Sequence, residues 1–309
     1  MKIYFLLKVL VITCIIIFLY NIINWEIFLK NLLQVNIPLF FSGVIVSLFL
    51  PIIAVFRWQK ILIEIGYKIN FSNVFKVIMM SFSANLFAPA KSGDLIKIFA
   101  HTTIKNKSNI FSGLLTDRIA DLIALSILCF FGSIYLKFLP GLFTGLFIFS
   151  AIFFLIVFIN FFEFNFKQKL INKIYLILKK SFQLFYISFN KIFLIIFFAL
   201  SQWLLTSFQV WLFFTSFNIS IPFFVVIAMF PITVILSLIP LTPSGIGIRE
   251  VSFVILFATY SDPHVSLAVG TSYYLSSVVL PALLGLKFFK DYVKKIDLIK
   301  LRKKFKSFF

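Results

Sequence analysis

The sequence is poor in charge, in acidic residues above all, and in cysteine. Charged residues make up only 13% of the 309 positions, and hydrophobic residues make up 61%. A soluble domain has about a quarter charged and about half apolar residues, so this composition excludes an ordinary soluble protein. Apolar stretches recur from Ile3 to Leu286 without a long polar block. We therefore expect one membrane domain, with the bilayer as its main solvent.

The residues that usually carry catalysis or bind metals are also scarce. The two cysteines, Cys14 and Cys129, each lie inside an apolar stretch and lack the spacing of a metal site or of an extracellular disulfide framework. The sequence has no metal-binding pattern of histidine and carboxylate, no nucleophile elbow and no phosphate-cradling glycine loop. We expect no metal, no cofactor and no catalytic residue, and we favour a transporter over an enzyme.

Six apolar stretches approach the length of a membrane-spanning helix, which is about 20 residues. Two further apolar regions, 74–103 and 222–260, are interrupted midway by proline, glycine and charge. We interpret each as a re-entrant helical hairpin, so the predicted fold class is an all-α polytopic membrane protein with about six full spans and two hairpins. The predicted spans are 3–24, 39–56, 110–136, 141–162, 192–217 and 265–286.

The distribution of Lys and Arg predicts the orientation. With the N-terminus inside, 23 of the 29 basic residues lie in cytoplasmic segments and only Lys30 and Lys137 lie outside. This bias agrees with the excess of basic residues in cytoplasmic loops, so we predict a cell (inner) membrane protein with both termini cytoplasmic. The net charge of +19 then attracts anionic lipid and needs no nucleic acid. A hairpin that crosses the membrane twice gives the same orientation and remains an alternative.

We predict a single membrane domain over 1–290 and a basic cytoplasmic tail over 291–309. The first stretch begins like a signal peptide, with Lys2 and Lys8, but it has no small-residue cleavage site, so we expect an uncleaved span. The segment 163–191 alternates lysine with apolar residues. This pattern is typical of an amphipathic helix on the inner membrane surface, and a solvated loop is the alternative.

The two interrupted regions share a pattern of proline, glycine and charge. A glycine follows four places after Pro89 and after Pro243, as Gly93 and Gly247, and Pro240 adds a further break in the second region. Proline ends a helix and glycine permits unusual backbone shapes. The freed backbone groups are tolerated in a membrane only when buried in protein or lining a hydrated cavity. In the predicted topology the two hairpins point in opposite directions, as in transporters built from inverted repeats.

Eight ionisable side chains fall within apolar segments. Each isolated charge at the bilayer centre costs about 2.5–3.5 kcal/mol, so we expect the four cations and four anions to pair with one another. They mark either a substrate pathway or structural ion pairs that only hold the hairpins in place. The predicted substrate-binding residues are these eight with three glycines, namely Lys91, Gly93, Asp94, Lys97, Asp117, Arg118, Asp121, Gly245, Gly247, Arg249 and Glu250.

At these residues the chain resembles the transmembrane region of the lysylphosphatidylglycerol synthase/flippase family. Compared with the usual family motifs, the charged substitutions keep the sign of each charge, and a serine replaces one glycine. Lysine is a weaker bidentate phosphate partner than arginine. The resemblance is carried by Asn85 with Pro89-Ala-Lys91-Ser-Gly93-Asp94-Leu-Ile-Lys97, by Asp117-Arg118-Ile-Ala-Asp121, and by Pro240-Leu-Thr-Pro243-Ser-Gly245-Ile-Gly247-Ile-Arg249-Glu250.

The resemblance implies a protein that moves a lipid between leaflets. Some family members add a soluble aminoacyl-transfer domain or a glycosyltransferase, and we expect a stand-alone member without aminoacylation activity. Our leading hypothesis is a flippase-like transporter of an anionic phospholipid or a lipid-linked glycan precursor, with the headgroup phosphate or diphosphate as ligand. The alternatives are a membrane-embedded transferase that acts on a lipid-linked sugar, with Asp117 or Glu250 as general base, and an accessory membrane subunit of a separate lipid synthase. A separately encoded synthase or glycosyltransferase and a second copy of the chain are open as partners.

Overall fold

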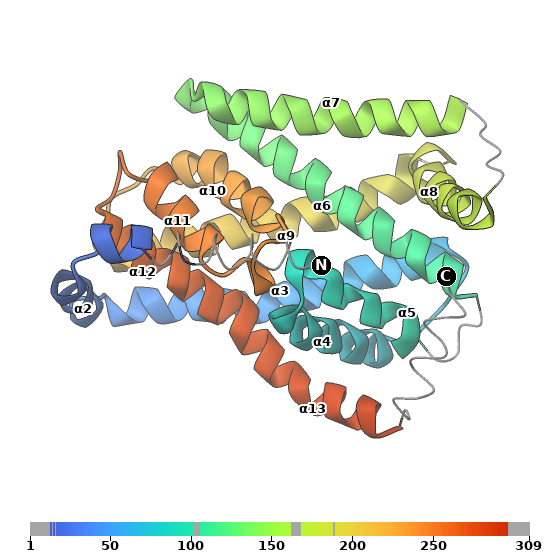
Figure 1. The fold of residues 1–309 in the computed structure, drawn as a ribbon, viewed down its shortest axis with the longest axis horizontal. Helices are drawn as coiled ribbons and strands as arrows, with labels where there is room; N and C mark the ends of the chain where they lie inside the picture. Colours follow the sequence, from blue (N-terminus) through green and yellow to red (C-terminus); the bar gives the residue numbers. More distant parts are fainter. Residues whose placement is uncertain are drawn as a thin grey trace.

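The protein is a bundle of helices in the computed structural model (Figure 1), which describes residues 13, 15, 17–101, 106–161, 168–187 and 189–295. No strand occurs among these residues. The helices are α2 (Trp25–Leu33), α3 (Ile37–Glu64), α4 (Phe71–Phe87), η1 (Pro89–Leu95), α5 (Ile96–Ala100), α6 (Lys107–Leu136), α7 (Leu139–Phe161), α8 (Lys169–Ile187), α9 (Phe189–Ser216), α10 (Phe223–Ser237), η2 (Pro243–Gly245), α11 (Ile248–Leu256), α12 (Pro263–Tyr274), η3 (Leu275–Val279) and α13 (Leu280–Lys295).

Five of the described helical segments are long and apolar enough to cross a membrane, which confirms an all-helical, multi-pass protein. The predicted span 3–24 lies mostly outside the described residues. The predicted span 39–56 is too short, because α3 continues to Glu64. The five segments are Ile37–Glu64, Lys107–Leu136, Leu139–Ile159, Ile192–Ser216 and Pro263–Tyr292.

The first interrupted region folds as a helix, a break and a short returning helix. Ala88 has an extended backbone before Pro89, and this ends α4. Ala90 and Lys91 then adopt left-handed φ values of 50° and 55°, which are uncommon outside glycine. The chain resumes as α5, which in Figure 1 runs back toward the end of the molecule where α4 began.

The second interrupted region repeats this design from the opposite end of the molecule (Figure 1). Helix α10 ends at Ser237, ahead of the two prolines of the break. Ser244 has a φ of 53° and Gly247 a φ of 85°, and α11 begins directly after this glycine. The two breaks meet, since the Ser244 amide donates a hydrogen bond of 3.3 Å to the Ala88 carbonyl.

The returning helices are short. Helix α5 has 5 residues and α11 has 9, whereas a full crossing takes about 20. Their length therefore favours hairpins that enter and leave on one side over two full crossings. The predicted amphipathic segment is helical over α8, and its placement on the membrane surface stays a prediction.

Long helices hold the two hairpins together through close packing. Helix α3 packs along α9, and α6 packs against both α7 and α10. At the contact of α6 with α10, a Cβ atom on Gly132 would lie 2.7 Å from the backbone nitrogen of Ala228, so only glycine allows this approach. On α7, Phe147 and Phe154 are exposed, as expected of side chains that face lipid.

The fold and the basic-residue bias together make a topology that labelling can test. We expect single cysteines at Lys30, Lys137 and Asn218 to react in intact cells with a membrane-impermeant maleimide, because Lys30 is exposed on α2 and the other two join helices, all at the predicted outer side. Cysteines at Lys68 and Asn106 should react only after permeabilisation. Both native cysteines are replaced by serine in this background. Labelling of position 106 but not 68 in intact cells would contradict a hairpin that returns to its starting side.

Candidate functional site

A buried ion-pair network lies where α3, the first hairpin and α6 meet. Asp117 forms an ion pair with Arg57, with Nε 2.8 Å from Oδ1, and accepts a hydrogen bond from Lys97, with Nζ 3.2 Å from Oδ2. Asp121 lies 2.6 Å from Nη1 of Arg57 and 3.0 Å from Nη1 of Arg118. Because each aspartate contacts two or more cations, the network satisfies charges that would be costly alone at membrane depth.

Asp94 connects the first break to this network. Its Oδ2 atom lies 3.0 Å from Nη2 of Arg118 and 3.8 Å from Nζ of Lys97. Its Oδ1 atom accepts a hydrogen bond of 2.8 Å from the Asn85 amide on α4. The hairpin is therefore tied to α6 by charge and to its own first helix by a neutral hydrogen bond.

Arg57 belongs to this network, although the predicted span 39–56 ends before it and leaves it in a cytoplasmic loop. The side chain is only 3% exposed and completes the network from α3. The apolar pattern continues beyond it, because Trp58, Ile61 and Leu62 are all buried. This spacing is typical of one face of a helix and is the signal that would have extended the predicted span.

Arg249 and Glu250 form a second charged group, at the start of α11, and neither belongs to the ion-pair network. The Glu250 carboxylate accepts a hydrogen bond of 2.6 Å from the Gly247 amide and so caps α11. Nη2 of Arg249 donates to the Ser244 carbonyl at 3.0 Å, while its guanidinium lies 5.3 Å from the ring centroid of Tyr273. The Nε and Nη1 atoms of Arg249 are buried without a hydrogen-bond partner. An unsatisfied buried donor of this kind calls for a ligand or a water.

Lys91 is the other cation without an acidic partner. Its Nζ atom lies over the ring of Trp203, 4.9 Å from the centroid. Among the described residues no carboxylate oxygen lies within 4.0 Å of a side-chain nitrogen of either Lys91 or Arg249. The expectation that all eight charges pair with one another therefore holds for only five, namely Asp94, Lys97, Asp117, Arg118 and Asp121.

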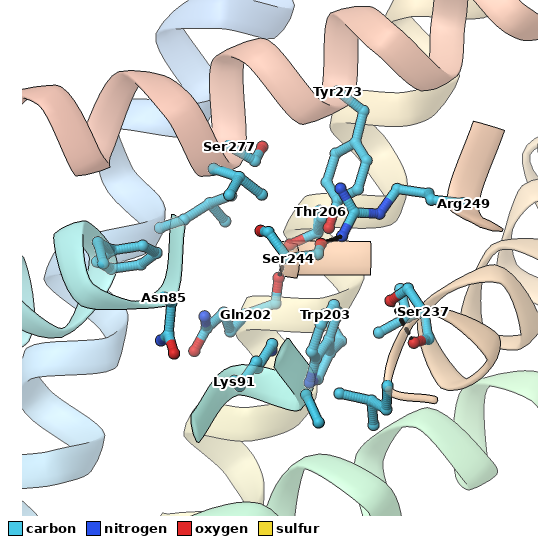
Figure 2. A pocket seen from close by; sticks show the side chains of 16 residues that line it. Asn85, Lys91, Gln202, Trp203, Thr206, Ser237, Ser244, Arg249, Tyr273 and Ser277 are labelled. Atoms are coloured by element: carbon cyan, nitrogen blue, oxygen red, sulfur yellow. Dashed lines mark hydrogen bonds between the residues drawn. The ribbon is translucent and has the colours of Figure 1, made fainter. Parts of the chain in front are cut away.

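Both unpaired cations line one cavity of about 100 Å³, whose lining mixes polar and apolar side chains. Figure 2 shows Lys91 and Arg249 on opposite sides of this cavity, with Gln202, Trp203 and Thr206 of α9 between them. Asn85 lines this cavity and also a second one of about 70 Å³, whose other lining residues include those of the ion-pair network. The structure thus brings residues of both hairpins to one place, where two cations lack acidic partners among the described residues.

The predicted glycines and prolines shape the site without lining this cavity. A Cβ atom on Gly93 would overlap the backbone of Ala84 and Asn85, and one on Gly245 would lie 2.8 Å from Cβ of Ser237. These glycines let each break fold back against its own helix. Pro89 opens η1 and Pro243 opens η2, and Pro240 lies in the turn between α10 and η2.

The polar face of α9 is a part of the site that the sequence analysis did not identify. Gln202, Thr206 and Gln209 are spaced by four and three residues inside an apolar span, and such spacing places side chains on one helix face. Gln209 donates to the Ser276 hydroxyl at 2.9 Å and accepts from the Ser277 hydroxyl at 2.7 Å. Both serines belong to the π-helical turn η3, a feature that often marks functional sites.

Loss of Arg57 should destabilise the fold, because Asp117 and Asp121 would each lose a buried partner. Breaking a buried ion pair typically costs about 3–5 kcal/mol, so we expect Arg57→Gln to lower the thermal unfolding midpoint clearly in detergent. The control is Lys60→Gln on the same helix, whose partly exposed pair with Glu64 has an N–O distance of 3.2 Å and should contribute about 1 kcal/mol or less. Equal midpoints for the two variants would contradict a stabilising role for the network.

Comparison with known proteins agrees with this architecture. UPF0104 membrane protein MJ1595 of Methanocaldococcus jannaschii is 23% identical over 291 residues, which covers 83% of this chain and 85% of that protein. The family described as "Lysylphosphatidylglycerol synthase TM region" matches residues 5–285, nearly the whole chain and both hairpins. This chain therefore belongs to the lysylphosphatidylglycerol synthase transmembrane-region family of membrane proteins.

Proposed function

We propose that the protein is a flippase-like transporter that moves an anionic lipid between the leaflets of the cell membrane, with its headgroup phosphate bound between Lys91 and Arg249. The observation that carries this proposal is the presence of two cations without acidic partners in one cavity, buried Arg249 and half-buried Lys91, each contributed by a different hairpin. A phosphate oxygen can supply the acceptors that the unpartnered donors of Arg249 lack.

The balance of buried charge supports a ligand with one negative charge. Five cations lie in the two charged groups, since Arg57 joins Lys91, Lys97, Arg118 and Arg249, whereas the acids number four. A phosphodiester with an otherwise neutral headgroup would bring this sum to zero. A headgroup that carries an additional ammonium would meet no free carboxylate of the described residues in the cavity that holds Lys91 and Arg249.

The arrangement of the hairpins supports transport. In the predicted orientation the first hairpin enters from the cytoplasm and the second from outside, and their breaks meet at the cavity. Transporters with inverted repeats bind substrate at such a junction near the midplane and expose it alternately to the two sides. The basic cytoplasmic face would also enrich anionic lipid, by about 1 kcal/mol for each Lys or Arg near the surface.

The arrangement supports catalysis less well. A transferase needs a carboxylate free to accept a proton, but Asp117 is surrounded by three cations and Glu250 is engaged with the Gly247 amide. The lipids of a deletion strain distinguish the two functions. Accumulation of an unchanged lipid supports transport, whereas the loss of a modified lipid supports a transferase.

Reconstitution tests the proposal directly. Vesicles are loaded with phosphatidylglycerol that carries a fluorescent label, and dithionite quenching reports how much label reaches the inner leaflet. We expect Arg249→Gln and Lys91→Gln each to slow the movement at least about tenfold, because a hydrogen bond to a charged group contributes about 1.5–3 kcal/mol and 1.4 kcal/mol is a factor of ten.

The matched control is Lys30→Gln, which removes an exposed positive charge on α2 far from the cavity residues in sequence. It should transport at the wild-type rate. Absence of transport by the wild-type protein, over a panel that includes phosphatidylglycerol and a polyprenyl-linked glycolipid, would overturn the proposal. Equal rates for wild type and both cavity variants would overturn the assignment of the phosphate site.

A further inference from the structure

A mostly apolar cavity of about 210 Å³ lies between α6, α9 and α10. Leu122 and Leu125 line it from α6, Trp203 from α9 and Val234 from α10. The charged residues at its edge include Arg118 and Asp121, which pair with each other at 3.0 Å. The cavity is larger than the apolar cavities of about 150 Å³ that stay dry and bind benzene, so a segment of hydrocarbon chain fits inside it.

The antiparallel packing of α6 and α10 accounts for the position of this cavity. The two helices touch at Gly132 and Ala228, where glycine allows backbone contact. Two to three turns nearer the N-terminus of α6, the chain presents Leu125 and Leu122 in place of glycine. The larger side chains hold the helices apart there, and a space remains between them and the end of α10.

This apolar cavity adjoins the cavity that holds the proposed phosphate site, because the two share five lining residues. Trp203 and Lys91 lie at the boundary, with the lysine amino group over the indole ring. A single molecule that reaches both cavities must therefore carry a charged group and a hydrocarbon chain close together. The residues that line both cavities are Ala90, Lys91, Trp203, Val234 and Leu238.

We infer that the apolar cavity binds the first part of an acyl chain of the lipid whose phosphate lies between Lys91 and Arg249. This inference rests on the proposed function and extends it. The protein would recognise the chain next to the headgroup as well as the headgroup, and only the distal part of the chain would remain in the bilayer. The ligand class is a phospholipid with a single phosphodiester and an acyl chain.

A lipid with a spin label tests the inference on the intact protein. Phosphatidylglycerol carries a nitroxide at carbon 5 or at carbon 14 of one chain, and the electron paramagnetic resonance spectrum reports the immobilised fraction. We expect a strongly immobilised component for carbon 5 and little for carbon 14. We expect Leu122→Trp, which fills the apolar cavity alone, to reduce the carbon 5 component several-fold.

The matched control is Ile134→Trp, a change of similar size at an exposed position of the same helix, which should leave the carbon 5 component unchanged. Arg249→Gln separates the two hypotheses, because it removes the phosphate contact and should weaken lipid binding. If it does not weaken binding, the proposed phosphate site fails. If it does, but Leu122→Trp retains the wild-type spectrum, the chain site alone is overturned.

A crosslinking measurement needs no substitution and so does not depend on the stability of a variant. Phosphatidylglycerol with a diazirine near carbon 6 is photolysed with the wild-type protein, and the modified peptides are identified by mass spectrometry. Adducts on Leu122, Leu125 or Val234 support the inference. Adducts confined to outward-facing residues such as Phe147 and Phe154 of α7 would overturn it.

Discussion

The pairing of buried charge in a low-dielectric interior is the constraint on which the rest of this structure depends. Two aspartates one turn apart on α6, Asp117 and Asp121, gather cations from three elements of the chain. The first hairpin can break its helix at membrane depth because Asp94 and Lys97 join this network. The aspartates therefore fix the position of the hairpin as well as balancing its charge.

The same pairing leaves two cations, Lys91 and Arg249, without an acidic partner among the described residues. The acidic residues of the two charged groups are engaged with Arg57, Lys97, Arg118 or a helix N-terminus. Trp203 links the two charge systems, since its indole donates to Asp121 at 2.8 Å while Lys91 lies over its ring. The ion-pair network and the proposed phosphate site are thus adjacent, and only the proposed site contains cations without an acidic partner among the described residues.

Several features of the fold followed from the sequence with little ambiguity. Proline and glycine around Pro89 and Pro243 predicted the two breaks, because their effect on the backbone is local. The i,i+4 spacing of Asp117 and Asp121 predicted a shared face for the same reason. Arg57 was placed wrongly because hydropathy alone does not distinguish a charge at the end of a span from a charge buried within a longer helix.

The sequence by itself determined the membrane class, the helical content, the breaks and all the charges of the network except Arg57, since these depend on composition and local backbone chemistry. Only the tertiary structure decided which cations are neutralised and which remain free. That assignment depends on distances between α3, α6 and the two hairpins, which are far apart along the chain. The positions of the cavities also depend on how these helices pack, because each cavity is the space left where packed helices diverge.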